Sequence, residues 1–214
     1  MTQVEPRPAA TRDPKRTKAA ILAAAREVFA RRGFDGARID SIAAASGVNK
    51  RMIYYYFTDK EGLFLAVLEA VYTELSRSAE ALDLSADPEE ALARYVELTF
   101  AYYVANPHTI AILNNENLYE ARHLRGSTVL PELKRPYVDK LNHVLRAGAE
   151  RGVFRAELDT VTVHITVIAL VYLFVGNNAT LSVYFERDLA TEAAHAAWLE
   201  HIEGCVLALV RAPA

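Results

Sequence analysis

Helix-start signals recur along this chain and constrain its fold more than any other feature. Asp13-Pro14 and Asp87-Pro88 each join a capping side chain to a proline that suits the first helical turn. Apolar residues between such signals repeat at helical spacing, and no segment shows sustained strand alternation closed by hairpin turns. The sequence therefore predicts an all-α protein of about nine helices.

A short helix, a glycine-containing turn and a second short helix follow one another near the N-terminus. Ile39 and Ile42 mark the first helix, Gly47 the turn, and Asn49 can cap the second helix, which covers residues 50–57. This order is the helix-turn-helix arrangement, whose second helix enters the major groove of DNA.

The second short helix has two chemically different faces. Ile53 and Phe57 lie one turn apart and can pack inward, whereas Lys50 and Arg51 lie in the first turn, where side chains reach base edges. The three tyrosines at 54–56 cannot all be buried on one helix, so at least one phenol must face outward. This pattern predicts a DNA-reading helix.

Charge is distributed unevenly along the chain, although its net charge is only −3. Residues 1–60 carry twelve Lys and Arg against six Asp and Glu, whereas the remainder is acidic overall. A basic segment attached to an acidic one is typical of a module that binds polyanions. The asymmetry alone is weak evidence, because many solvated surfaces are uneven.

Three stretches of the N-terminal part, residues 33–43, 46–57 and 59–63, resemble the DNA-binding domain of the TetR family. With the helix that precedes them, from about Arg12, the resemblance covers roughly 50 residues without a gap. It implies a three-helix helix-turn-helix domain, expected at residues 12–60. It also implies DNA contacts for a set of residues in and around the second short helix: Arg38, Asn49, Lys50, Arg51, Met52, Tyr54, Tyr55, Tyr56 and Lys60.

Two positions depart from the commonest pattern of that family. Ala37-Arg38 replaces a pair of hydroxyl residues, so Arg38 is either a substitute phosphate contact or a solvated side chain. Arg51 stands where glycine is frequent, and it is expected to read DNA through its guanidinium, for example at a guanine. Of the tyrosines, Tyr54 is expected to be partly buried, and Tyr55 is the stronger candidate for a DNA contact.

The remaining residues, 61–214, resemble the helical domain with which TetR-type regulators bind an effector and dimerise. A capping box at Thr58 and Glu61 predicts a long first helix, and further helices are expected to about Arg151, from Asp159 to about Ala179, and from about Leu189 to Val210. The resemblance implies a homodimer through the last two helices. Polar residues on apolar helices are pocket candidates, though most such groups are satisfied core residues: Tyr103, Asn117, Arg122, His123 and Asn177.

Other function classes lack support in the sequence. There is no Gly-rich phosphate loop, no nucleophile–base pattern and no helical pair of histidines at zinc spacing, so neither an enzyme nor a metal or other cofactor is expected. The single cysteine, Cys205, fits a reducing cytoplasm. Residues 1–10 lack the apolar core of a signal peptide and suggest a loose tail, and no membrane span is expected.

These observations predict a cytoplasmic, homodimeric transcription regulator, most simply a repressor released from a pseudo-palindromic DNA operator by a small-molecule effector. Two alternatives stay open: a dimeric small-molecule sensor that has lost operator specificity, and an architectural DNA-binding dimer. A single selected operator favours the first reading, whereas uniform, salt-dependent binding to any duplex favours the architectural one.

Overall fold

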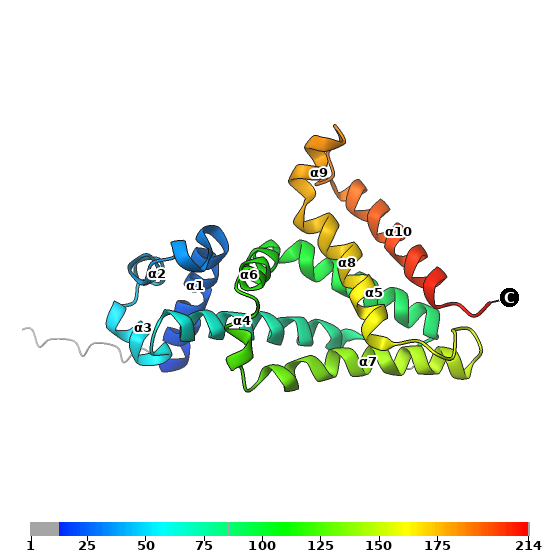
Figure 1. Ribbon diagram of the computed structural model, residues 1–214, viewed down its shortest axis with the longest axis horizontal. Helices are drawn as coiled ribbons and strands as arrows, with labels where there is room; N and C mark the ends of the chain where they lie inside the picture. The colour runs from blue at the N-terminus through cyan, green and yellow to red at the C-terminus, as the bar shows by residue number, and fades with distance from the viewer. Residues whose placement is uncertain (1–12, 85, 214) are drawn as a thin grey trace, which may run out of the picture. The chain divides into compact units, whose positions relative to one another are not determined.

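The computed structural model describes residues 13–84 and 86–213, except for the side chains of residues 79 and 134 (Figure 1). The expected N-terminal tail and Arg12, the first residue of the expected DNA-binding domain, lie outside these residues. The described chain is all-α, as predicted, and its only β-type pairing is an isolated bridge between Phe154 and Arg211. Its ten α-helices are α1 Pro14–Gly36, α2 Ile39–Ser46, α3 Lys50–Phe57, α4 Lys60–Ser78, α5 Pro88–Ala105, α6 Pro107–Leu118, α7 Leu130–Glu150, α8 Thr160–Gly176, α9 Asn178–Tyr184 and α10 Glu192–Val210, with 3-10 turns at Ala79–Ala81 and Leu124–Gly126.

The helix in excess of the expected nine is α9. The sequence predicts one apolar helix from Asp159 to about Ala179, but α8 ends at Gly176 and Asn177 leaves helical geometry. The chain bends by 68° between α8 and α9. No single described helix is long and apolar enough to cross a membrane, and only the bent pair of α8 and α9 passes a test of length and composition.

The described residues form two compact units that divide between Val67 and Leu68, within α4. We call residues 13–67 the N-terminal unit and the described residues from 68 onward the C-terminal unit. The N-terminal unit packs around side chains that are fully buried, among them Ile21, Phe29, Ile42 and Ile53. The ring of Phe64 lies 4.8 Å from that of Phe29 in an edge-to-face arrangement, which favours this packing.

Local side-chain hydrogen bonds set the limits of the short helices. Gly47 ends α2 in the left-handed conformation with a φ of 63°, and the side chain of Asn49 accepts a hydrogen bond from the amide of Arg51 at 2.9 Å, as expected of a cap. The expected capping box at Thr58 is wrong. Thr58 ends α3 with a φ of 63°, and Asp59 instead caps α4 by accepting from the amide of Gly62 at 2.7 Å.

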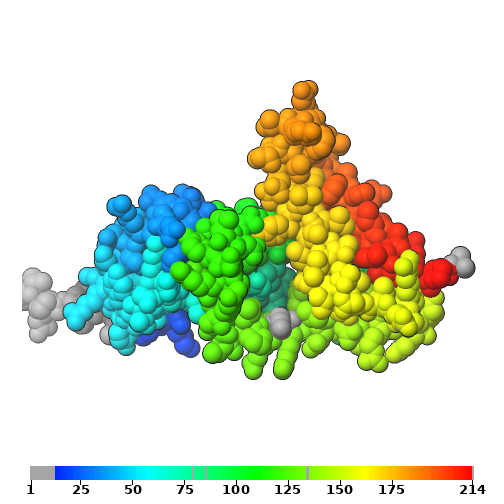
Figure 2. Space-filling view, in the orientation of Figure 1, coloured from blue at the N-terminus to red at the C-terminus, as the bar shows by residue number. Residues whose placement is uncertain are grey.

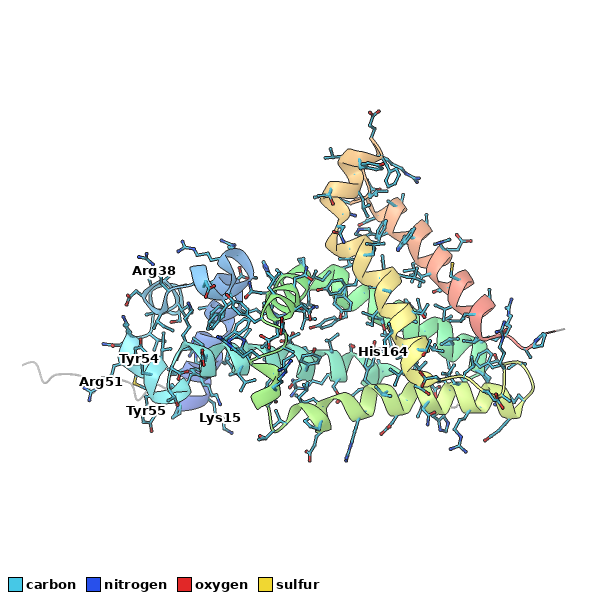
Figure 3. All side chains as sticks on the ribbon, viewed as in Figure 1. Lys15, Arg38, Arg51, Tyr54, Tyr55 and His164 are labelled. Atoms are coloured by element: carbon cyan, nitrogen blue, oxygen red, sulfur yellow. The ribbon has the colours of Figure 1, made fainter. Side chains whose placement is uncertain are left out.

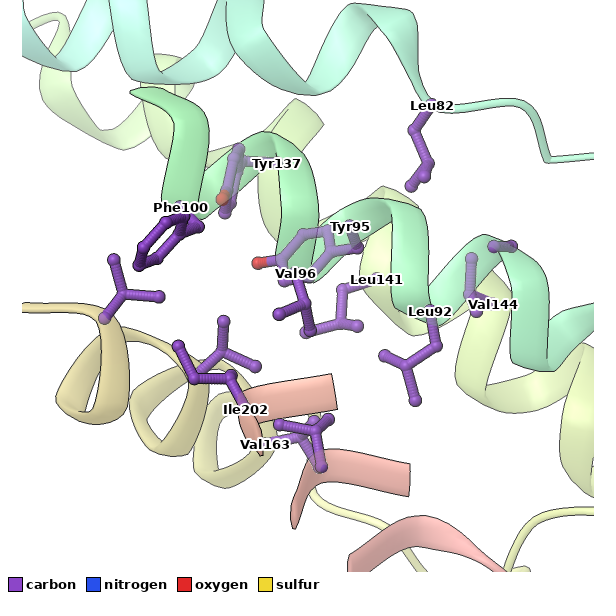
Figure 4. Close-up of a cluster of buried hydrophobic side chains, with 14 of the residues drawn as sticks. Leu82, Leu92, Tyr95, Val96, Phe100, Tyr137, Leu141, Val144, Val163 and Ile202 are labelled. Atoms are coloured by element: carbon purple, nitrogen blue, oxygen red, sulfur yellow. The ribbon is translucent and has the colours of Figure 1, made fainter. Parts of the chain in front are cut away.

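In the C-terminal unit, α5 lies at the centre of the core, packed against α7, α8 and α10 (Figure 4). Helices α8 and α10 pack against each other, with α9 at their tip (Figure 2). The loop after α7 is held by the ring of Phe154, whose nearest atom lies 2.0 Å from where a Cβ would stand on Gly148. This close approach requires glycine at that position of α7.

Candidate DNA-binding surface and effector cavity

One face of α3 carries buried apolar side chains and the other carries exposed polar ones, as the sequence predicts. Ile53 is fully buried and Phe57 is 6% exposed, so both side chains anchor the helix to the N-terminal unit. Tyr54 is 44% exposed and Tyr55 77% exposed, and Arg51 is exposed as well. Figure 3 shows Arg51 and Tyr55 projecting from α3 away from the packed helices.

Lys50 lies in the first turn of α3 but is already engaged by α2. Its Nζ lies 2.8 Å from Oδ1 of Asp40. The hydrogen bond that Lys50 donates to Asp40 raises the pKa of Lys50. The ammonium is therefore held beside α2, and reaching a base edge requires it to leave or share this carboxylate.

Lys60, expected to contact a phosphate, also has partners within the N-terminal unit. Its Nζ donates a hydrogen bond to the carbonyl oxygen of Asp35 at 3.3 Å and lies 4.6 Å from the centre of the Phe34 ring. These contacts tie the start of α4 to the end of α1. Substitution of Lys60 is thus expected to affect folding stability as well as any DNA contact.

The other residues expected at the DNA differ in exposure. Arg38 is exposed at the start of α2, and its side chain makes no capping hydrogen bond there. Met52 and Tyr56 are half-buried, and the Tyr56 ring packs edge-on against that of Tyr55 at 5.2 Å. Asn49 uses its amide oxygen for the helix cap.

The basic residues at the start of α1 contribute to the positive charge of residues 1–60 but are not among the expected DNA contacts. Lys15 is exposed in the first turn of this helix, and Nζ of Lys18 lies 5.6 Å from the centre of the Phe57 ring, beside α3. The signal was present, since the two lysines follow the Asp13-Pro14 cap within one turn. They add positive charge near the candidate surface.

A cavity of about 570 Å³ lies in the C-terminal unit. This volume falls within the range of small-molecule sites. The wall comes from helices α4 to α8 together with Leu124 and Asn177, and it is largely apolar and aromatic. Its polar members are Tyr72, Ser76, Tyr103, Glu116, Asn117, Tyr137, His164, Tyr172 and Asn177.

The expected ligand-binding residues divide into two groups. Tyr103, Asn117 and Asn177 line the cavity, whereas Arg122 and His123 are absent from its wall. The guanidinium of Arg122 lies 5.5 Å from the centre of the Tyr119 ring. His123 is buried, and its Nδ1 lies 2.6 Å from Oε2 of Glu116.

Glu116 is a buried carboxylate on the cavity wall that the sequence reading did not assign to the pocket. Its Oε1 accepts hydrogen bonds from the amides of His123 and Leu124, each at 2.9 Å, and its Oε2 faces the His123 ring. The carboxylate thereby stabilises the turn after α6, where Glu120 and Ala121 adopt positive φ angles. No sequence pattern predicts this pairing, because it depends on that turn.

Phenols from four helices gather at the cavity. Burial raises the pKa of Tyr103, and it raises that of Tyr172 to about 12, so both stay protonated near neutral pH. Tyr172 donates to the amide oxygen of Asn114 at 2.7 Å. Behind the wall, Oη of Tyr95 lies 2.7 Å from Nδ1 of His164, and burial lowers the pKa of this histidine.

Helices α8 and α10 also carry an exposed face of apolar and small residues. On α8, Val161, Ile165 and Leu173 are each more than half exposed. On α10, several small residues at helical spacing are exposed: Ala193, Ala197, Gly204 and Ala208. Exposed apolar and small residues gathered on helices in this way are typical of an association surface.

Models of one protein family match both the N-terminal and the C-terminal part of the chain. A family model described as bacterial regulatory proteins of the tetR family matches residues 21–67, and one described as the tetracyclin repressor-like C-terminal domain matches residues 88–206. The transcriptional repressor NicS of Pseudomonas putida is 39% identical over 193 residues, covering 90% of this chain and 91% of that protein.

A second repressor and a solved structure are also similar to this chain. The transcriptional repressor SCO4008 of Streptomyces coelicolor is 37% identical over 147 residues, covering 67% of this chain and 70% of that protein. The crystal structure of a TetR family transcription regulator from Marinobacter aquaeolei has a TM-score of 0.72 and 18% identity, covering 93% of this chain and 97% of that one. The structural match shows a shared fold.

Proposed function

Because the chain belongs to the TetR family of bacterial transcription regulators, we propose that α3 is its recognition helix and that the cavity receives its effector. Members of this family are DNA-binding, ligand-responsive, dimeric regulators and not enzymes. Residues 12–60 are assigned to DNA binding and residues 61–214 to effector binding and dimerisation. Since NicS and SCO4008 are named repressors, we assign repression to this chain, and action in the cytoplasm, where bacterial operators lie.

One observation carries the DNA-binding assignment: the opposite faces of α3. Two apolar side chains fix the helix from within, while Arg51 and Tyr55 stand free of the core on the outer face. Arg51 supplies bidentate donors to a base edge, and the phenols of Tyr54 and Tyr55 donate to phosphates. Lys60 and Arg38 add charge at the margin of this surface.

We assign the dimer interface to the exposed face of α8 and α10. Small residues on α10 allow two copies of the helix to approach closely, and the apolar side chains on α8 gain burial from association. One short recognition helix covers few base pairs. Two copies related by a twofold axis place their recognition helices about 34–36 Å apart, which is one turn of DNA.

Binding of labelled random duplex by α3 variants tests the assignment. Tyr54→Ala together with Tyr55→Ala is expected to weaken binding to all sequences because phosphate contacts are lost, and to leave its dependence on salt unchanged because the phenols carry no charge. Arg31→Ala is the matched control, since Arg31 is exposed on α1 and is paired with Glu27. Unchanged binding by the tyrosine variant, with both proteins folded, contradicts the role of α3.

Lys60 needs a second readout, because it also packs against Phe34. Lys60→Ala is expected to weaken binding to every duplex alike and to lower the salt slope by about one. Thermal unfolding of the same variant separates a lost phosphate contact from a loosened N-terminal unit. Unchanged DNA affinity in Lys60→Ala contradicts the placement of the α4 start at the DNA backbone.

A further inference from the structure

The described polar groups on the cavity wall are uncharged, apart from one carboxylate that is already hydrogen-bonded within the protein. Among the wall residues whose side chains the structure describes, none is lysine or arginine. The one carboxylate, Glu116, already accepts from two backbone amides and faces the His123 ring. An anionic occupant therefore finds no described counter-charge, and burying a charge without a partner is costly.

Thr99, Tyr137, Tyr95 and His164 form hydrogen bonds behind the wall. The hydroxyl of Thr99 donates to the carbonyl oxygen of Tyr95 at 2.8 Å, so the Tyr137 hydroxyl, which contacts Thr99 Oγ1, is the donor in that pair. Tyr95 is left to bond Nδ1 of His164 at 2.7 Å. A phenol is a good donor and a neutral imidazole nitrogen a good acceptor, so we take Tyr95 to donate to His164 and not to the Tyr137 hydroxyl, with which it also interacts.

With Tyr95 as the donor, the tautomer of His164 follows. An imidazole that accepts at Nδ1 carries its proton on Nε2. Burial lowers the pKa of His164, so the ring is neutral near pH 7. Nε2 lies on the ring edge opposite Nδ1 and has no hydrogen-bond partner among the described residues, although His164 lines the cavity. The Nε2–H group of His164 can therefore donate a hydrogen bond to a molecule in the cavity.

We propose that the effector is an uncharged, largely apolar molecule whose hydrogen-bond acceptor, a carbonyl oxygen or a ring nitrogen, binds the Nε2–H group of His164. The proposal rests on the proposed function, because it names the chemical class of that effector. Tyr95 is a positioning residue: it holds the imidazole in one tautomer and does not itself touch the effector. The surrounding phenols and apolar side chains supply the rest of the contact.

Three probes that share a naphthalene ring test the charge preference of the full-length protein by calorimetry. They are methyl 2-naphthoate, the 2-naphthoate anion and 2-naphthyltrimethylammonium. The ester is expected to bind at least about tenfold more tightly than either charged probe. Tighter or equal binding of a charged probe overturns the proposal, and so does the absence of measurable ester binding.

The His164→Phe variant tests the donor itself. It keeps a ring but removes Nε2–H, so it is expected to lose about three- to tenfold of the affinity for the ester and little for unsubstituted naphthalene. His195→Phe is the control, because His195 packs against Phe100 and Phe174 and does not line the cavity. Equal losses for ester and naphthalene contradict a specific hydrogen bond.

Nitrogen-15 NMR of the imidazole rings gives a readout that requires neither effector nor DNA. The wild type is expected to show His164 with its proton on Nε2, and Tyr95→Phe to redistribute the two tautomers. A proton on Nδ1 in the wild type overturns the proposal even if the protein binds DNA. Failure of the proposed function appears differently, as lack of operator binding in a protein that still prefers the ester.

Discussion

At the scale of single residues, Arg51 carries the chemistry that most distinguishes this chain. Its guanidinium is exposed in the first turn of α3, beside the cap of the helix. Arg51→Ala is expected to relax base preference at one position of each half-site, at a cost of about 1–3 kcal/mol in discrimination. Binding to a panel of single-base operator variants measures this effect. A uniform loss across the whole panel indicates instead that Arg51 contacts only phosphate.

A second residue-scale prediction concerns acid. Because burial lowers the pKa of His164, the unfolded chain takes up this proton first as pH falls below about 6.5, and stability is lost over that range. His164→Gln keeps an acceptor for Tyr95 but does not titrate. Between pH 7.5 and 5, urea unfolding is expected to show a smaller loss of stability in His164→Gln than in the wild type. Equal losses in the two proteins contradict a lowered pKa.

At the scale of elements, the capping of α3 connects folding to DNA reading. Asn49 accepts from the amide of Arg51, so the cap and the reading side chain belong to the same turn. Asn49→Ala is expected to lower the free energy of unfolding by about 0.5–2 kcal/mol, and Asn49→Ser to preserve most of it. Chemical denaturation of both variants checks this. Similar stability of the alanine and serine variants shows that another group begins the helix.

Element limits were predictable wherever a short-range hydrogen bond sets them. The caps at Asp13, Asn49 and Asp87 all form as the sequence predicts. The start of α4 was misassigned, because Thr58 ends α3 with a positive φ and the side chain of Asp59 caps α4 instead. The pattern of apolar residues from Asp159 to Ala179 also did not predict that the chain bends after Gly176.

The candidate cavity was less predictable, because its wall is assembled from five helices. Single polar residues on apolar helices pointed to Tyr103, Asn117 and Asn177 on the wall. The same rule also selected His123, which instead pairs with Glu116. Whether a polar side chain meets a cavity or a buried partner depends on tertiary packing.

At the scale of the whole molecule, dimerisation links the two functions. Ala197 is exposed on α10 within the proposed dimer face. Ala197→Arg is expected to yield monomers in analytical ultracentrifugation and to reduce operator affinity by more than tenfold, because two tethered recognition helices bind far better than one. Ala101→Arg, on an exposed position of α5, is the control. A dimeric Ala197→Arg protein places the twofold contact elsewhere.

Selection of binding sites from a random duplex library tests the central claim most directly. A dimeric regulator that reads DNA through α3 is expected to enrich one pseudo-palindromic site, with half-sites about one helical turn apart. The enriched site should bind at least about a thousandfold more tightly than random duplex at physiological salt. Failure to enrich any sequence, with uniform and steeply salt-dependent binding to all duplexes, contradicts a specific regulator and indicates an architectural DNA-binding dimer.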